Sequence, residues 1–253
     1  MEIVSATRKS EVNFPFTPLG ISLAFLSDAS VAIRPQISFD NQLGLPTIYN
    51  DRIAAVSEDD VLLFVHDDVW LHDFYVVEHV EEGLARFDVV GVAGNPTRVA
   101  QQKAWHTVDG DKWAPNLSGA VAHGLCPASR ITYFGPVPKA CALLDVVFLA
   151  ARRSTLKRAN VRFDEQFRFD FYDLDFCCAA RAAGLRLGTW SIPITHASGG
   201  AFGSASWTAA LPGYLKKWGS TEDDCRPAIQ KAAAREAAPS DLVPPTDSTE
   251  VKD

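Results

Sequence analysis

A run of five apolar residues, Val61–Val65, leads directly into His66, Asp67 and Asp68. The run is apolar at every position and too short for a membrane span, which favours a strand buried on both faces of a parallel sheet. The acidic residues then lie at the carboxyl end of that strand, where open α/β sheets bind their ligands. Carboxylates there are suited to holding a divalent cation against a phosphate-bearing substrate. If strand geometry continues, His66 and Asp68 face one side and Asp67 the other. The alternative is that the carboxylates only cap a following helix.

A second polar cluster lies between residues 163 and 175, where carboxylates alternate with aromatic residues. Asp173 and Asp175 fall in the first turn of a predicted helix, where the helix dipole favours an ionised carboxylate. Because residues two apart do not share a helix face, both cannot point at one site. One of them is therefore a candidate general base, while the other caps the helix or pairs with Arg181. Capping alone is the alternative without chemistry.

His196 is a third candidate, because it follows a predicted strand and precedes the glycine-rich segment 197–203. An imidazole is a good ligand for manganese-like ions and a poorer one for magnesium. The glycine-rich loop after it could close over a bound ligand. A single histidine is more often a structural residue, so both interpretations stay open at this point.

The segments that must position these clusters alternate between strand and helix patterns up to residue 95. This alternation predicts an α/β fold with a mainly parallel central sheet flanked by helices. Residues 97–139, rich in Gly, Pro, Trp and His, instead predict a smaller part made of irregular loops and short antiparallel strands. The predicted strands are 2–7, 20–26, 61–65, 88–93, 143–151 and 185–194. The predicted helices are 45–56, 73–87 and 173–183, the last ended by Gly184.

The chain has 253 residues, of which 47% are hydrophobic, enough for one large α/β domain with a sizeable core. Residues 1–220 are predicted to form this single domain. Residues 221–253 are predicted to be an acidic, Ala- and Pro-rich tail that is partly disordered. A net charge of −7 argues against a nucleic-acid partner bound through its phosphates, but not against a small phosphorylated ligand.

The sequence also carries signals about location. No segment has the length and apolarity of a transmembrane helix, and the N-terminus lacks a signal-peptide pattern, which predicts a cytoplasmic protein, at most peripheral to the inner face of a membrane. Five cysteines without zinc-like spacing favour reduced thiols. The apolar residues around Lys216 and Lys217 could touch a membrane surface, although packing on the domain is favoured. They are Trp207, Leu211, Tyr214, Leu215 and Trp218.

Taken in order, these motifs resemble the bacterial family-2-type glycosyltransferases, which have the nucleotide-sugar-binding GT-A fold. The similarity covers residues 43–203. Residues 64–69, with the sequence FVHDDV, resemble the family's metal-binding DxD segment in the His-x-Asp form of one subgroup. The other segments that resemble the family are 44–50, 144–150 with Arg152 and Arg153, 163–176, Gly184 and His196.

The resemblance implies transfer of a sugar from a nucleoside diphosphate, most readily a UDP-sugar, to a hydroxyl of a glycan or lipid-linked acceptor. It implies inversion at the anomeric carbon, with Asp173 as the general base. It also implies Mn²⁺ or Mg²⁺ bound by Asp68 and His196, with His66 as a further ligand. The expected nucleotide contacts are Thr7, Arg8, Asp67 and Asp68. The expected acceptor-side residues are Asp145, Asp175 and Trp105.

The chain departs from the family pattern at two residues. His66 replaces the first Asp of the metal motif, and Tyr172 replaces the acid before the expected base. Two other classes therefore stay open: a glycoside or phosphate hydrolase with paired carboxylates, and a catalytically silent module that binds sugar nucleotides. A nucleotidyltransferase is disfavoured, because residues 7–11 after the first strand contain no glycine for a phosphate loop.

Overall fold

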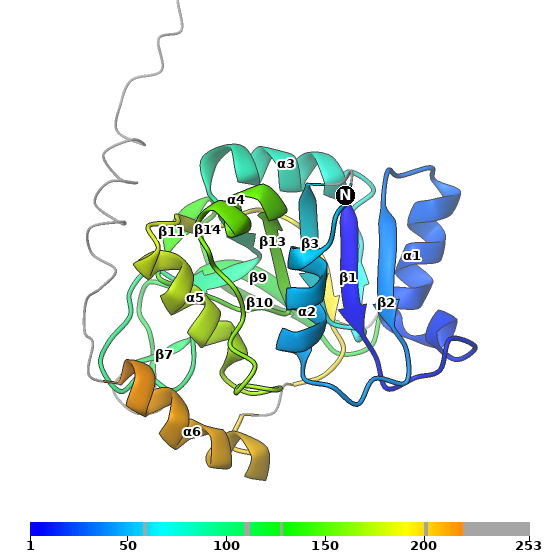
Figure 1. Ribbon diagram of the computed structural model, residues 1–253. Helices are drawn as coiled ribbons and strands as arrows, with labels where there is room; N and C mark the ends of the chain where they lie inside the picture. Colours follow the sequence, from blue (N-terminus) through cyan, green and yellow to red (C-terminus); the bar gives the residue numbers. More distant parts are fainter. Residues whose placement is uncertain (58–59, 109–111, 127–128, 200–201, 220–253) are drawn as a thin grey trace, which may run out of the picture.

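The structure is a computed structural model that describes residues 1–57, 60–108, 112–126, 129–199 and 202–219 (Figure 1). The predicted acidic tail, residues 221–253, lies outside the described residues, as does Cys225. Among the described residues no helix is long and apolar enough to cross a membrane. The four described cysteines, Cys126, Cys141, Cys177 and Cys178, are free thiols.

A seven-stranded sheet forms the centre of the molecule. Pairing directions show that β2, β1, β3, β5 and β14 run one way, while β13 and β11 run the opposite way. The predicted α/β fold with a mainly parallel central sheet is therefore confirmed. In spatial order the strands are β11 (Lys139–Cys141), β14 (Leu187–Thr189), β5 (Val89–Gly91), β13 (Phe148–Arg152), β3 (Val61–Val65), β1 (Glu2–Ala6) and β2 (Arg34–Ser38).

A second, smaller sheet lies beside the first and is largely antiparallel. Its only parallel pair joins β15 to β9 among the strands that the structure describes. In spatial order it contains β12 (Leu143–Leu144), β6 (Ala93–Asn95), β9 (Ser118–His123), β15 (Ile194–His196) and β4 (Val69–Leu71), with β10 (Arg130–Gly135) paired to β9. A separate ribbon joins β7 (Thr107–Val108) to β8 (Lys112–Trp113). The short antiparallel strands predicted in residues 97–139 are thus present.

Six α-helices and one 3₁₀ helix surround the sheets within the described part of the chain (Figure 1). Of these, α2 packs on β1, α3 packs on β5 and β13, and α5 packs on β12. The helices are η1 (Phe14–Phe16), α1 (Pro18–Asp28), α2 (Leu45–Ala54), α3 (Val76–Arg86), α4 (Arg153–Arg158), α5 (Tyr172–Ala182) and α6 (Ala205–Trp218).

The predicted strand 20–26 is wrong, because these residues belong to helix α1. Thr17 begins the helix by accepting a hydrogen bond from the amide of Gly20 at 3.0 Å, and Pro18 occupies the first turn. The residues that α1 buries include Leu19, Leu23 and Leu26, whose spacing of four and three is that of a helix face. The apolar composition of residues 20–26 fits a strand as well as a helix, and the cap at Thr17 is the feature that decides for the helix.

Three predicted strands are each divided into two shorter ones. Residues 88–93 give β5 and β6, residues 143–151 give β12 and β13, and residues 185–194 contain β14 and lead into β15. In each case the first and second strands belong to different sheets. At the break after β12, Asp145 Oδ1 accepts a hydrogen bond from the amide of Val147 at 3.2 Å, which turns the chain. The division leaves Asp145 outside both strands.

Helix α6 packs on the domain. Tyr214 is fully buried, and Trp207, Leu211, Leu215 and Trp218 pack against the hydrophobic core. Phe171 stacks on Tyr214 with ring centroids 4.9 Å apart. The apolar residues around Lys216 and Lys217 thus cover the domain, as the favoured alternative expected.

Candidate active site

The carboxyl end of β3 brings three candidate ligands together. All five residues of β3 are buried, and His66, Asp67 and Asp68 follow where the strand ends. His196 reaches the same place from β15, where it is paired with Val69, and the amide of Ala197 donates to the carbonyl oxygen of Asp68 at 2.9 Å. As a result, His196 Nε2 lies 3.4 Å from Asp68 Oδ2.

His66, Asp68 and His196 form a candidate metal centre, which we call the metal cluster. One ligand atom from each residue lies within 4.8 Å of the other two. Two imidazole nitrogens and one carboxylate oxygen form a mixed donor set that suits a manganese-like cation better than an all-oxygen magnesium site. All three side chains are partly buried, so a cation bound here would act in a medium that screens its charge less than bulk water.

The charges in the metal cluster favour the ionised form of the Asp68 side chain. Burial opposes the charge on Asp68, but the hydrogen bond and charge of His196 outweigh it and hold the pKa of Asp68 well below its usual range. Burial likewise opposes the charge on His196, and Asp68 outweighs it to raise the pKa of His196. Burial lowers the pKa of His66, which keeps this imidazole neutral and able to donate a lone pair. The residues therefore fit a divalent cation.

The two departures from the family pattern contact each other. Tyr172 Oη lies 2.6 Å from His66 Nε2, a hydrogen bond between side chains 106 positions apart. Burial raises the pKa of Tyr172 well above its usual value, so the group is a neutral phenol. With Nε2 engaged by Tyr172, Nδ1 is the nitrogen of His66 that is left for a metal. Tyr172 thus fixes the ring of His66, in the way that partners of metal-binding histidines do.

Replacing Tyr172 by phenylalanine is expected to weaken Mn²⁺ binding by about 10-fold or more, because the ring of His66 loses the partner that orients it. Isothermal titration calorimetry with Mn²⁺ measures this affinity directly. The matched control is Tyr49→Phe, since Tyr49 is fully buried in the same aromatic cluster and its hydroxyl has no hydrogen-bond partner among the described residues. Equal losses in the two variants would show that Tyr172 acts through packing alone.

A cavity of about 430 Å³, which we call the aspartate cavity, opens beside the metal cluster. His66 and His196 line one part of it, and Asp145 and Asp173 line another. Much of the remaining wall is aromatic, and Trp105 packs on Phe134 with ring centroids 5.0 Å apart. Flat apolar rings of this kind provide stacking surfaces for sugar rings. The aromatic residues are Trp105, Trp113, Phe134, Phe169, Phe171, Tyr172, Phe202 and Trp207.

Asp173 is placed in the aspartate cavity by the first turn of α5. Burial raises the pKa of Asp173 to about 7, and the negative charges of Asp145 and Asp170 raise it further. Hydrogen bonds from backbone amides favour the ionised form and oppose this shift without cancelling it. A carboxyl group with this pKa can accept a proton near neutral pH, which suits a general base. The residue before the helix, Phe171, has φ +64° in the left-handed region, which is uncommon for an aromatic residue. This backbone conformation was not visible in the sequence.

The expected nucleotide contacts lie at the neighbouring end of β1. Thr7 Oγ1 donates to Asp67 Oδ2 at 2.5 Å, so Asp67 is directed towards β1 and away from the metal cluster. Thr7, Arg8, Asp67 and Asp68 line one cavity of about 300 Å³, which we call the strand-end cavity. Leu45, from the segment 44–50, and Asn41, which the sequence did not single out, also line this cavity. Asn41 is positioned by its amide, which donates to the carbonyl oxygen of Thr7 at 2.8 Å.

Of the three expected acceptor-side residues, Asp145 and Trp105 line the aspartate cavity, and Asp175 does not. Asp175 is fully buried, and its Oδ1 accepts hydrogen bonds from Lys217 Nζ and Trp218 Nε1, each at 2.7 Å. The expectation that Asp175 lies on the acceptor side is therefore wrong. Asp175 points to the opposite side of α5 from Asp173 and anchors α6. The periodicity of a helix already required that the two carboxylates diverge.

A scan against models of protein families gives no match, and a search of curated proteins gives none either. Solved structures do match. Drosophila β1,4-galactosyltransferase 7 in complex with xylobiose is 13% identical with a TM-score of 0.41, covering 75% of this chain and 63% of that chain. A TarS fragment from S. aureus in complex with UDP-GlcNAc is 13% identical with a TM-score of 0.47, and the match covers 93% of this chain and 72% of that chain. The present chain thus spans less than two thirds of the length of the Drosophila chain. Because these TM-scores are below 0.5, what the chain does is inferred from its own residues.

Proposed function

We propose that this protein is a metal-dependent, inverting glycosyltransferase that uses a nucleoside-diphosphate sugar, with a UDP-sugar as the first donor to test. The observation that carries the proposal is that residues of the metal cluster and the candidate base Asp173 line the same cavity. His66 and His196 of the metal cluster line the aspartate cavity together with Asp173, and His66 and Asp68 of the same cluster line the strand-end cavity. A donor diphosphate and an acceptor hydroxyl can thus be held side by side.

The residues divide the reaction between them. Asp68, His196 and His66 would hold Mn²⁺ or Mg²⁺, which supplies positive charge to a leaving diphosphate. Thr7, Arg8 and Asp67 line the strand-end cavity, where the nucleotide would bind. Asp173 accepts the proton of the acceptor hydroxyl while the hydroxyl oxygen forms a bond to the anomeric carbon. The bond from that carbon to the diphosphate oxygen breaks, the diphosphate keeps the electron pair, and attack from the opposite face inverts the configuration.

The aromatic wall indicates what kind of acceptor fits. Trp113 and Phe134 stack with ring centroids 5.6 Å apart, and Trp105 packs edge-on against Phe134. Sugar rings present apolar C–H faces to such surfaces, so a glycan or a lipid-linked glycan is the proposed acceptor. A cytoplasmic location and contact with a membrane surface stay predictions of the sequence.

An acceptor-dependence assay tests the proposal against its alternatives. The protein is incubated with UDP-sugars and Mn²⁺, with and without a panel of oligosaccharides, and release of UDP is measured. Release that rises with one acceptor supports glycosyl transfer. Release at the same rate without any acceptor would indicate a hydrolase, and binding of UDP without release from any sugar would indicate a silent binding module.

The pKa of Asp173 gives the proposal a pH signature. A general base works in its ionised form, so kcat/KM is expected to rise about tenfold per pH unit below pH 7 and to level off above it. An aspartate with an ordinary pKa of 3.8 would instead give a rate that is already level at pH 5 to 6. Initial rates from pH 5 to pH 9 at saturating metal distinguish the two, and a level profile over that range would contradict the assignment of Asp173.

A further inference from the structure

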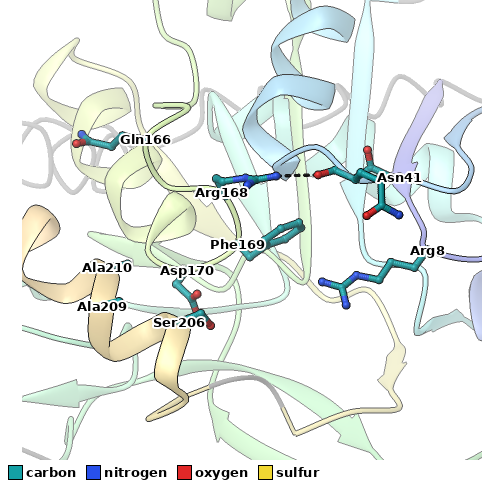
Figure 2. A pocket seen from close by; sticks show the side chains of 10 residues that line it. Arg8, Asn41, Gln166, Arg168, Phe169, Asp170, Ser206, Ala209 and Ala210 are labelled. Atoms are coloured by element: carbon teal, nitrogen blue, oxygen red, sulfur yellow. Dashed lines mark hydrogen bonds between the residues drawn. The ribbon is translucent and has the colours of Figure 1, made fainter.

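A cavity of about 580 Å³ adjoins the site described above at Phe169, and Figure 2 shows it from close by. Four segments far apart in the sequence form its walls: Arg8 after β1, the loop 41–42, the segment 166–170 and the first half of α6. We call it the arginine cavity, because Arg8 and Arg168 both line it.

Two guanidinium groups are gathered on one aromatic ring in this cavity. Arg8 Cζ lies 5.8 Å from the centroid of Phe169 and Arg168 Cζ lies 5.9 Å from it, and Figure 2 shows the ring between the two side chains. Cation–π contacts of this kind hold arginine side chains in place and leave their N–H groups available to a ligand. The ring is 41% exposed, so the three side chains form an open surface.

The position of Arg168 is fixed by its backbone and by one side-chain hydrogen bond. The amide of Leu45 donates to the carbonyl oxygen of Arg168 at 2.9 Å, and Arg168 Nη2 donates to the carbonyl oxygen of Gln42 at 2.7 Å. A Cβ atom at Gly44 would lie 2.9 Å from the Cα of Arg168, so glycine is required for this close approach. The loop 42–45 thus holds Arg168 at the cavity.

The arginine cavity has an excess of positive charge. Among the described residues, no carboxylate lies within salt-bridge distance of Arg8 or Arg168. Asp170 is the acidic residue that lines the cavity, and its side chain is largely buried. Two guanidinium groups against one carboxylate favour an anion, and the planar fork of arginine is matched to phosphate oxygens.

We propose that the arginine cavity binds a phosphate group of the acceptor, an inference that rests on the proposed glycosyltransferase function. Arg8, Asn41 and Phe169 also line the strand-end cavity, where the donor diphosphate would meet the metal cluster, but Arg168 does not. Phe169 and Asp170, however, line both the arginine cavity and the aspartate cavity. An acceptor whose hydroxyl lies at Asp173 can therefore pass Phe169 and place a phosphate between the two arginines.

Thermal-shift titrations with inorganic phosphate, without metal or nucleotide, test the site. Sodium chloride at matched ionic strength corrects for general salt effects. A ligand that binds the folded state raises the melting temperature by mass action. The wild type and Arg162→Gln, a neighbouring exposed arginine outside the cavity, are expected to show the same increase. Arg168→Gln is expected to lose at least four fifths of it, and Arg168→Lys, which keeps the charge but not the fork, to give an intermediate value. Equal shifts in wild type and Arg168→Gln would overturn the proposal.

Repeating the titration with UDP and Mg²⁺ at saturation identifies the source of the phosphate. If the acceptor supplies it, the increase with inorganic phosphate persists on top of the increase with UDP. Loss of the phosphate increase in the presence of UDP would assign the arginines to the donor and overturn the proposal. Failure of the proposed glycosyltransferase function has a different readout. UDP would then leave the melting temperature unchanged in the wild type and in the Arg168 variants alike.

Discussion

Replacing Asp173 by asparagine is expected to lower the rate of glycosyl transfer by about 10²–10⁴-fold, because the acceptor hydroxyl loses the group that takes its proton. The affinity for UDP with Mn²⁺ should stay near the wild-type value, since the carboxylate lines the aspartate cavity and not the strand-end cavity. Steady-state rates together with titration of UDP measure both. The companion variant Asp145→Asn changes another carboxylate of the same cavity and should keep at least a tenth of the activity.

The same variant has an expected effect on stability. Because the pKa of Asp173 is raised from 3.8 to about 7 in the folded state, the ionised carboxylate destabilises the fold as pH rises above the unfolded-state pKa. Asp173→Asn removes that cost, so it should stabilise the protein by about 4 kcal/mol at pH 8 and have little effect at pH 4. Thermal melts at the two pH values measure the difference. A variant that keeps wild-type activity would show that Asp173 is not the base. A stability difference that is the same at both pH values would show that the pKa of Asp173 is not raised in the folded protein.

Replacing Asp68 by alanine is expected to remove the effect of Mn²⁺ on UDP binding and to lower activity by at least about 100-fold. Asp68 supplies the only carboxylate of the metal cluster in the described part of the chain, and His196 loses its partner at 3.4 Å. Without that negative charge, two neutral imidazoles are a weak site for a divalent cation that also binds oxygen ligands. Calorimetric titration of UDP with and without Mn²⁺ measures the coupling.

The control for Asp68→Ala is Asp51→Ala, which makes the same chemical change at an exposed position of α2. This variant should bind Mn²⁺ and UDP as the wild type does. An Asp68→Ala protein whose UDP affinity still depends on Mn²⁺ to the wild-type extent would rule out the metal cluster as the binding place of the cation.

The sequence predicted those parts of the site that depend on a single element. The apolar run Val61–Val65 is a buried strand, and α5 begins at Tyr172, one residue from the predicted start. Strand alternation also placed His66 and Asp68 on one side, and the structure brings their ligand atoms together. These features follow from local periodicity, which a sequence carries directly.

Features that depend on contacts between distant segments could not be predicted in this way. The pairing of β15 with β4, which brings His196 to Asp68, is a matter of strand register. The hydrogen bond between His66 and Tyr172 joins two residues that the sequence marked only as separate departures. Likewise, Arg8 and Arg168 meet on Phe169 because the loop 42–45 lies against residue 168.

The errors in secondary structure have a common cause. Residues 20–26 and the three divided strands are rich in apolar residues, and apolar composition alone neither separates a buried helix from a strand nor marks where a strand breaks. The signals that decide them are polar: the Thr17 cap that begins α1 and the Asp145 turn that ends β12. Side-chain hydrogen bonds to the backbone at element ends therefore carried information that hydrophobicity did not.

Binding of nucleoside diphosphates with and without Mn²⁺ tests most directly that the metal cluster and the strand-end cavity together hold a sugar-nucleotide donor. The melting temperature is measured with UDP, GDP, CDP and ADP, each in the presence of Mn²⁺ and in its absence. An increase with one diphosphate that requires Mn²⁺ is predicted, and it would also name the base of the donor. The absence of a metal-dependent increase with any of the four would contradict the glycosyltransferase assignment.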